Sequence, residues 1–245
     1  MQLHRYAMTA PSATRVIYVV ALACLLVPSL AKAADDADTD RITASGNVMK
    51  ELLNASSGVP RGLLNKADCV IILPSVKKGG FIVGAQYGKG LMTCRSGQNF
   101  NGAWSAPIMM QSSGGSFGLQ AGGQATDFVI LVMNEGGARA VLNGKAKLGA
   151  DASVAAGPLG RDAEASTNAS MSAQMLSYSR SQGAFAGVSL SGTSLGPDSG
   201  ANEKIYGKKV SGPEIFAGSV KAPAAASRLL ATLKSASPPS AHPKN

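Results

Sequence analysis

Two serines, Ser116 and Ser194, stand in the Gly-x-Ser-x-Gly pattern that holds the nucleophile of many hydrolases. Such a serine needs a buried strand before it, a sharp turn and a helix after it, and a base within reach. Ser116 is followed by the alternating residues typical of a strand, and Ser194 is followed by a further loop-like segment. His242 lies in a tail rich in Pro, Ser and Ala, so a serine hydrolase is the last of three hypotheses.

Metal, nucleotide and acid–base sites are not indicated by the spacing of their usual residues. The histidines and cysteines do not follow a zinc-ligand pattern, and the acids do not follow the spacing of a calcium loop. The segment 84–90 is rich in Gly but lacks the gap and the final Ser or Thr of a phosphate-binding loop. We therefore predict a protein without catalytic residues, metal or cofactor.

The excess of basic residues is the feature of this composition that points to a binding partner, one that is anionic. The chain has 23 Lys and Arg residues against 14 Asp and Glu residues, a formal net charge of +9. Each basic residue near an anionic membrane contributes ~1 kcal/mol, so a few that converge would suffice for reversible docking. The candidates are Arg41, Lys50, Lys77, Lys78, Lys89, Arg139, Lys145 and Lys147. The alternative for these residues is an ordinary solvated surface.

The first 33 residues have the parts of an export signal. Two arginines and no acid accompany an apolar run, Val16–Leu30, that is shorter than the ~20 residues needed to cross a membrane. Small residues at 31–33 then form a cleavage site. We predict cleavage after Ala33 and a periplasmic protein. The alternative is an outer-membrane lipoprotein attached through Cys24.

Removal of this leader changes the charge and the cysteine count. The loss of Arg5, Arg15 and Lys32 lowers the 23 basic residues to 20, which against 14 acids leaves a net charge of +6. An exported protein of this charge is expected to meet anionic lipid headgroups and no nucleic acid. Cys69 and Cys94 remain, and an oxidising compartment permits a disulfide between them. Two buried free thiols are the alternative.

Helical periodicity occurs near both ends of the chain. Residues 40–56 carry apolar side chains at helical spacing with charged residues off that stripe. The apolar stripe has two alternative places, a membrane interface or the protein core. Further helices are predicted at 60–67, 138–143, 201–206 and 223–234.

Short apolar or alternating runs between these helices predict strands. The runs are Cys69–Leu73, Phe81–Tyr87, Leu91–Arg95, Trp104–Met110, Phe117–Ala121, Phe128–Met133, Leu148–Val154 and Phe185–Leu190. We expect a hairpin turn at Gly88-Lys89-Gly90 and a loop at 191–200. Many short strands with Gly-rich turns, and no regular strand–helix alternation, predict a single α+β domain. Its sheet or barrel should be curved and largely antiparallel, with flanking helices.

The order of several short motifs resembles the SYLF domain family, also called Ysc84 or DUF500. The resemblance covers about residues 40–207. Its motifs include Gly58-Val59-Pro60, Lys78-Gly79-Gly80-Phe81, Trp104-Ser105-Ala106-Pro107, Asp127-Phe128-Val129-Ile130-Leu131, Ala155-Ala156-Gly157-Pro158 and Tyr178-Ser179-Arg180-Ser181. It implies a domain over 34–210, preceded by the signal peptide 1–33. A basic extension with a short helix and a disordered tail would follow at 211–245.

The resemblance also implies a function. Eukaryotic relatives bind phosphoinositides, and the part implicated in membrane contact corresponds to 40–56 here, with Arg41 and Lys50. Some relatives bind actin, but the chain resembles stand-alone exported bacterial members, so we expect an anionic phospholipid surface as partner and no actin. The leading hypothesis is a non-enzymatic phospholipid-binding protein of the cell envelope. The alternative is an envelope structural or adaptor protein that binds another protein.

Overall fold

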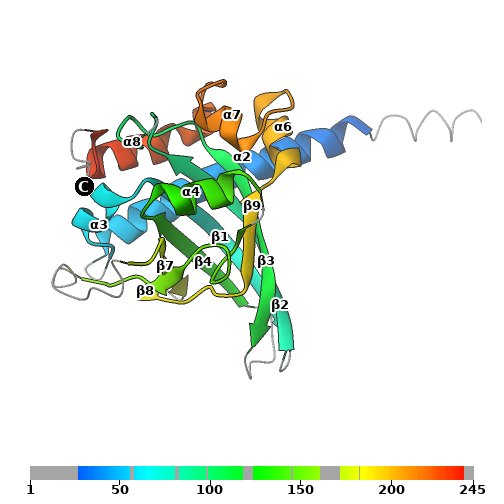
Figure 1. Cartoon of the computed structure of the whole chain (residues 1–245). Helices are drawn as coiled ribbons and strands as arrows, with labels where there is room; N and C mark the ends of the chain where they lie inside the picture. Colours follow the sequence, from blue (N-terminus) through cyan, green and yellow to red (C-terminus); the bar gives the residue numbers. More distant parts are fainter. Residues whose placement is uncertain are drawn as a thin grey trace, which may run out of the picture. The chain divides into compact units, whose positions relative to one another are not determined.

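The strands of the computed structural model form one curled sheet with helices packed around it (Figure 1). The structure describes residues 27–55, 58–80, 83–97, 99–117, 124–144, 146–160, 172–181 and 183–239. The helices are α2 (Val27–Asn54), α3 (Arg61–Lys66), α4 (Glu135–Leu142), α6 (Ser199–Tyr206), α7 (Gly212–Phe216), the 3-10 turn η3 (Ala224–Ala226) and α8 (Ser227–Ala236). The strands are β1 (Cys69–Gly80), β2 (Val83–Cys94), β3 (Ile108–Phe117), β4 (Gln124–Val132), β5 (Ala146–Lys147), β6 (Val154–Ala156), β7 (Met175–Ser181), β8 (Ala184–Gly187) and β9 (Thr193–Pro197).

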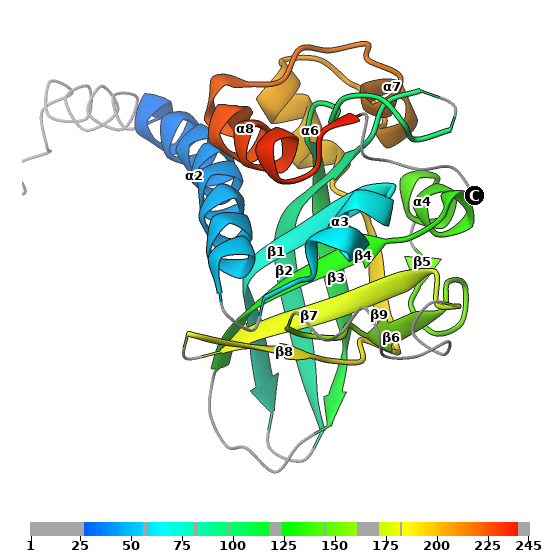
Figure 2. The ribbon, with the colours of Figure 1, turned by 90° about the vertical axis from the view of Figure 1, so that its left-hand side faces the viewer.

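The chain divides into two compact units, Met1–Ala37 and Asp38–Asn245, and the sheet belongs to the second. Among the described residues, the strand order is β5-β9-β3-β2-β1-β4-β7-β6, with β8 paired to β7. These pairs are antiparallel except β6 with β7. The sheet curls into a half-barrel (Figure 2). The predicted α+β fold with a curved, largely antiparallel sheet and flanking helices is confirmed.

A β-bulge bends the central strand β1. Its register against β2 shifts between Ile72 and Lys77, and Ser75 has a positive φ of 51°. Strand β2 passes very close to this bulge, since a Cβ on Gly90 would lie 1.9 Å from the carbonyl oxygen of Ile72. The predicted hairpin turn at Gly88-Lys89-Gly90 is therefore wrong. These residues lie inside β2, where glycine permits a close approach of two backbones instead of a chain reversal.

The apolar side chains of the sheet divide between two cores, one on each face. Val70 and Ile72 belong to a core with residues of α2, α3 and α8, whereas Ile71 belongs to a core with residues of α4 and α7. Both faces of β1 are thus covered, which explains why 69–73 is apolar at every position. Each fully buried Val or Ile contributes roughly 1.5–3 kcal/mol relative to an exposed one.

The apolar stripe of α2 packs in the first of these cores. Ile42, Met49 and Leu52 are fully buried. Helix α8 lies beside α2 (Figure 2). At this contact Gly46 of α2 faces Leu229 of α8. The sequence allows this apolar stripe to lie either at a membrane interface or in the protein core, and in the structure it lies in the core.

Several expected elements differ from the structure. Helix α2 begins at Val27 and not near residue 40. The expected loop 191–200 contains β9, which pairs with β3 through backbone groups, so its Gly, Ser and Pro content did not prevent strand pairing. Trp104 forms only an isolated bridge with Arg95, and β3 begins at Ile108.

Helix α8 and the residue that follows it are part of the folded domain. Helix α8 ends at Ala236, and the following Ser237 is buried. The tail beyond residue 239, with His242, lies outside the described residues. In the part of the chain that the structure describes, no helix has the length and apolar character of a membrane span.

Candidate functional site

The residues predicted to bind lipid headgroups lie on several separate elements. They are Arg41 and Lys50 on α2, Lys77 and Lys78 on β1, Lys89 on β2, Arg139 on α4 and Lys147 on β5, while Lys145 lies outside the described residues. Several of them are held by a neighbouring carboxylate or ring rather than directed at a common surface.

Arg41 and Lys89 are brought near each other, but each is bound to an acid. Arg41 pairs with Asp38, and the Nζ of Lys89 lies 2.6 Å from Oδ2 of Asp198. Burial alone would raise the pKa of Asp198, but the hydrogen bond from Lys89 and the backbone N–H of Ala201 outweigh it and hold that pKa below its usual value. The same hydrogen bond raises the pKa of Lys89, and the charge of Arg41 acts on both groups. This network holds elements together and is not a free cationic surface.

The two lysines of β1 differ in their surroundings. The Nζ of Lys78 lies 5.3 Å from the ring centre of Phe128, a cation–π contact. Lys77 is exposed and stands opposite Tyr87 of β2, whose side chain is 48% exposed. Lys77 and Tyr87 therefore form a small exposed pair on the sheet.

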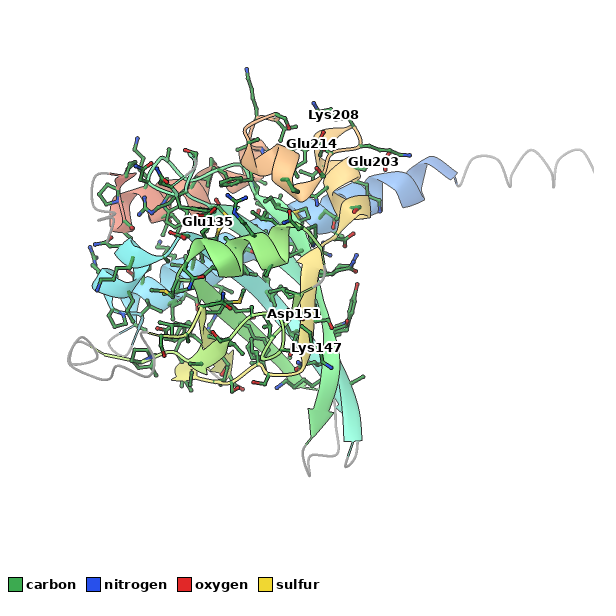
Figure 3. All side chains as sticks on the ribbon, in the orientation of Figure 1. Glu135, Lys147, Asp151, Glu203, Lys208 and Glu214 are labelled. Carbon is green, nitrogen blue, oxygen red and sulfur yellow. A yellow bond between two sulfur atoms is a disulfide. The ribbon has the colours of Figure 1, made fainter. Side chains whose placement is uncertain are left out.

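Arg139 and Lys147 lie on elements that pack against β9. Arg139 forms an ion pair with Glu135, one turn earlier on α4. The side chain of Lys147 is exposed, and its backbone N–H donates a 2.6 Å hydrogen bond to Asp151 (Figure 3). In the same view, Glu135 lies on α4, away from Lys147 and Asp151.

A groove of about 490 Å³ beside α2 gathers two exposed basic residues from distant parts of the chain. It is lined by Lys50 of α2, Arg228 of α8 and Phe185 of β8. The Nη1 of Arg228 lies 3.4 Å from Oδ1 of Asn47, which joins the two helices. In the described parts of the chain, neither Lys50 nor Arg228 forms an ion pair.

The only acid on the groove wall, among the described residues, is already paired. Glu51 lines the groove, and its Oε2 binds the guanidinium of Arg180 on β7. Arg180 also contacts Asp127 of β4 at 3.3 Å and lies over the ring of Phe185, 5.8 Å from its centre. Arg180 thus holds α2 against the sheet and reduces the negative charge that Glu51 presents to the groove.

Sequence reasoning found Lys50 but missed the rest of this groove. Asn47, Lys50, Glu51 and Asn54 share one face of α2, because they are spaced three and four residues apart. That polar face was visible in the sequence. Arg228, which stands off the apolar stripe of α8, was also visible as a surface cation, but nothing in the sequence placed it beside Lys50.

Two motifs of the family resemblance meet in a packing contact. A Cβ on Gly157 would lie 2.1 Å from Cζ of the buried Tyr178, so only glycine fits over this ring. The N–H of Gly157 donates to the carbonyl oxygen of Ser177, at 3.0 Å. The Ala-Ala-Gly-Pro and Tyr-Ser-Arg-Ser motifs therefore join β6 to β7.

The two candidate nucleophiles lie inside strands. Ser116 belongs to β3 and Ser194 to β9, opposite Ser113 of β3. Neither position is the strand–turn–helix that a nucleophile elbow requires. Among the described residues, no group of three or more His, Cys, Asp or Glu is placed to hold a metal.

Cys69 and Cys94 are joined by a disulfide in the structure. They are directly opposite each other on β1 and β2, and both are fully buried. The bond links the first residue of β1 to the last residue of β2.

Comparison with known proteins identifies the family. A sequence model described as "Ysc84: Las17-binding protein actin regulator" matches residues 113–236. The chain is 36% identical over 188 residues to Protein YSC84 of Saccharomyces cerevisiae, covering 76% of this chain and 39% of that protein. It is 33% identical over 198 residues to LAS seventeen-binding protein 3 of the same species, covering 80% and 42%. It is 34% identical over 199 residues to SH3 domain-containing YSC84-like protein 1 of Xenopus laevis, covering 78% and 58%.

These comparisons correct one expectation. The chain spans about half the length of the curated relatives that it matches. The expectation that actin plays no part among the partners is wrong, because the family is described as an actin regulator and relatives are named for binding Las17. The family description also names a regulator and no enzymatic activity. The family model matches residues 113–236, which is more than half of the 245 residues, and the relatives are 33–36% identical over more than three quarters of this chain, so the chain belongs to the Ysc84 (SYLF) family.

Proposed function

We propose that this protein binds anionic phospholipid headgroups, without catalysing a reaction, in the groove between α2, α8 and the turn before β8. The observation that carries the proposal is the convergence of Lys50 and Arg228 on this groove. Both are exposed and are free of ion pairs within the described residues.

The chemistry of the groove suits a phosphate. Arg228 offers planar guanidinium donors, and Lys50 offers a mobile ammonium group. The amide side chains of Asn47 and Asn54 line the same groove and add neutral donors. Phe185 also lines the groove, although most of its side chain is buried in the core.

The first test is vesicle co-sedimentation with the full chain. Phosphatidylcholine vesicles with phosphatidylglycerol should be bound, and pure phosphatidylcholine vesicles should not. Binding should weaken as salt rises, because exposed charges are screened. The double variant Lys50→Gln/Arg228→Gln should lower the affinity for the anionic vesicles about tenfold or more, since each cation contributes ~1 kcal/mol.

A matched control separates the groove from net charge. Lys209→Gln/Lys221→Gln removes the same two charges from exposed positions outside the groove. Glu51→Gln should strengthen binding, because it removes a carboxylate from the groove wall. Equal losses of affinity for anionic vesicles in the two double variants would show that only net charge matters. That result would contradict the groove as the binding site.

A second candidate function is binding of an actin-cytoskeleton protein, which the family description favours. Tyr87 is the one large apolar side chain that is well exposed among the described residues, and Lys77 stands beside it. Tyr is frequent among residues that dominate binding energy at protein interfaces. Co-sedimentation with actin filaments tests this candidate. Binding that Tyr87→Ser abolishes, in a variant that still binds vesicles, would assign the two functions to different surfaces.

Export is a separate part of the proposal. We propose cleavage after Ala33 and release into the periplasm, with attachment through Cys24 as the alternative. Amino-terminal sequencing of the protein purified from its cell of origin tests it. A chain that begins at Ala34 supports the proposal, and a chain that still begins at Met1 contradicts it.

A further inference from the structure

A second, more enclosed cavity lies away from the headgroup groove. It has a volume of about 390 Å³ and is bounded by the loop after β2, by α4 and by α7. Its walls are largely apolar, and the polar groups include one guanidinium and one amide. The lining residues that matter are Phe100, Ala106, Leu142, Phe216, Arg139 and Asn143. Cavities of this size and composition are typical of small-molecule sites.

The loop that forms one wall is held in a strained conformation. Phe100 has a positive φ of 51°, which is rare for a residue other than glycine. Its ring is buried and stacks on Phe216 of α7, with ring centres 5.1 Å apart. The loop is closed by hydrogen bonds from Phe100 N–H to Gly97 and from Gly102 N–H to Ser96. Strain that the surrounding structure maintains in this way is concentrated at functional sites, including ligand clamps.

The charged group of the cavity keeps part of its hydrogen-bonding capacity. The Nε and Nη2 atoms of Arg139 both contact the same oxygen of Glu135, Oε1. Among the described residues, Nη1 has no recorded partner. A carboxylate that enters the cavity can therefore accept a hydrogen bond from Arg139, in competition with Glu135.

We infer that this cavity binds an anionic amphiphile, with a medium-chain alkyl group between the stacked phenylalanines and Leu142 and a carboxylate at Arg139. The cavity shares no lining residue with the headgroup groove, so the inference does not depend on the proposed function. It adds a cavity for a single alkyl chain, with an exposed guanidinium at its rim, to a surface site for a headgroup.

Decanoate is the probe, at concentrations below those at which it forms micelles. Calorimetric titration of the full chain should show saturable binding of decanoate and about two- to fivefold weaker binding of decanol, which lacks the charge. Trp104, the single tryptophan of the chain, precedes two residues of the cavity wall, Ser105 and Ala106. Its fluorescence should change with the same midpoint as the heat.

Two variants of α4 should act in opposite directions. Arg139→Gln should weaken decanoate binding about two- to fivefold, since it removes a charged hydrogen-bond donor that is exposed to solvent. Glu135→Gln should strengthen it several-fold, because the competing carboxylate is gone. Both residues are well exposed, so these variants should fold. Ala217→Leu, at an exposed position on the cavity rim, should weaken decanoate and decanol alike by filling space.

The headgroup variant Lys50→Gln/Arg228→Gln serves as the control, because it should leave decanoate binding unchanged. Equal affinity for decanoate and decanol, or no effect of Arg139→Gln, would overturn the assigned orientation. The absence of any saturable heat would overturn the site itself. Loss of decanoate binding in the headgroup variant would likewise contradict a separate cavity.

Discussion

The ammonium group of Lys89 lies 2.6 Å from the carboxylate of Asp198, and this ion pair joins the middle of β2 to the start of α6. Asp198 is also the N-cap of α6, since its Oδ1 accepts a hydrogen bond from the N–H of Ala201 at 3.1 Å. One carboxylate therefore serves both a tertiary contact and a helix end.

Substitutions at Asp198 should separate these two roles. Asp198→Asn keeps a good N-cap but loses the ion pair, which should cost about 1–2 kcal/mol because Lys89 is partly exposed. Asp198→Ala loses both and should cost about 1 kcal/mol more. Urea denaturation measures the free energies of unfolding. Equal losses in the two variants would contradict the capping role.

The same pair predicts a pH dependence of stability. The folded pKa of Asp198 lies below 3.8, so its contribution is complete above that pH and is lost as pH falls through the folded value. The folded pKa of Lys89 lies above 10.5, so its contribution is complete below that pH and is lost as pH rises through the folded value. The stability difference between the wild type and Asp198→Asn should thus be constant at neutral pH and shrink at both extremes. A difference that changes between pH 6 and 8 would be inconsistent with these shifts.

The contact of Gly157 with Tyr178 should make β6 intolerant of any side chain. Gly157→Ala should lower the free energy of unfolding by about 1–3 kcal/mol or more, because the added methyl group meets the ring. Tyr178→Phe should be neutral or slightly stabilising, since the Tyr178 hydroxyl is buried without a hydrogen-bond partner among the described residues. Thermal unfolding of both variants is the measurement. A large loss from Tyr178→Phe would reveal a partner for the hydroxyl.

Arg95 should hold the segment that follows α8 against the rest of the domain. Its guanidinium is fully buried, binds the carbonyl oxygen of Ser237 at 3.0 Å and lies 4.6 Å from the ring centre of Trp104. Burial lowers the pKa of Arg95, against the opposing charge of Asp68. Arg95→Met should cost about 3 kcal/mol and should change the fluorescence of Trp104. Arg95→Lys should not restore stability, because one ammonium cannot reproduce the planar contacts. Full rescue by lysine would mean that only the charge matters.

The disulfide should add stability that a reductant removes. It closes a segment with a sequence separation of 25 residues, for which loop entropy predicts about 3 kcal/mol. Cys69→Ala/Cys94→Ala should lower stability by a similar amount. Denaturation with and without reductant is the measurement: the wild type should respond to the reductant and the variant should not. Equal stability of the oxidised wild type and the variant would show that backbone pairing alone holds the ends of β1 and β2 together.

Much of the architecture followed from local patterns. Helices α3, α4, α6 and α8 overlap the ranges where helices were expected, and β1 and β4 those expected from apolar runs. Strand β9 was missed, since its Gly, Ser and Pro content is typical of a loop and its pairing with β3 uses backbone groups. The turn at Gly88–Gly90 was misplaced because glycine marks both chain reversals and close strand contacts.

The candidate site was only partly visible. Lys50 was named, whereas its neighbour Arg228 was not, because the two are brought together by the packing of α8 on α2. Arg41, Lys89 and Arg139 were named as candidates for binding lipid headgroups, and in the structure each is paired with an acid. Arg41 and Arg139 pair with acids three and four residues away on the same helix, so helical spacing could have indicated these pairs. Lys89 pairs with Asp198, which is distant in the chain, and no local pattern shows such a contact.

The sequence by itself determined the class of fold, the excess of positive charge and the motifs of the Ysc84 family, since these depend on composition, periodicity and residue order. Only the tertiary structure decided which charges remain available and where they meet. Arg180 binding Glu51, and Arg228 lying beside Lys50, are contacts between residues far apart in the chain. Such contacts arise because α2 and α8 pack together on one face of the curled sheet, and that packing leaves no mark in any local stretch of residues.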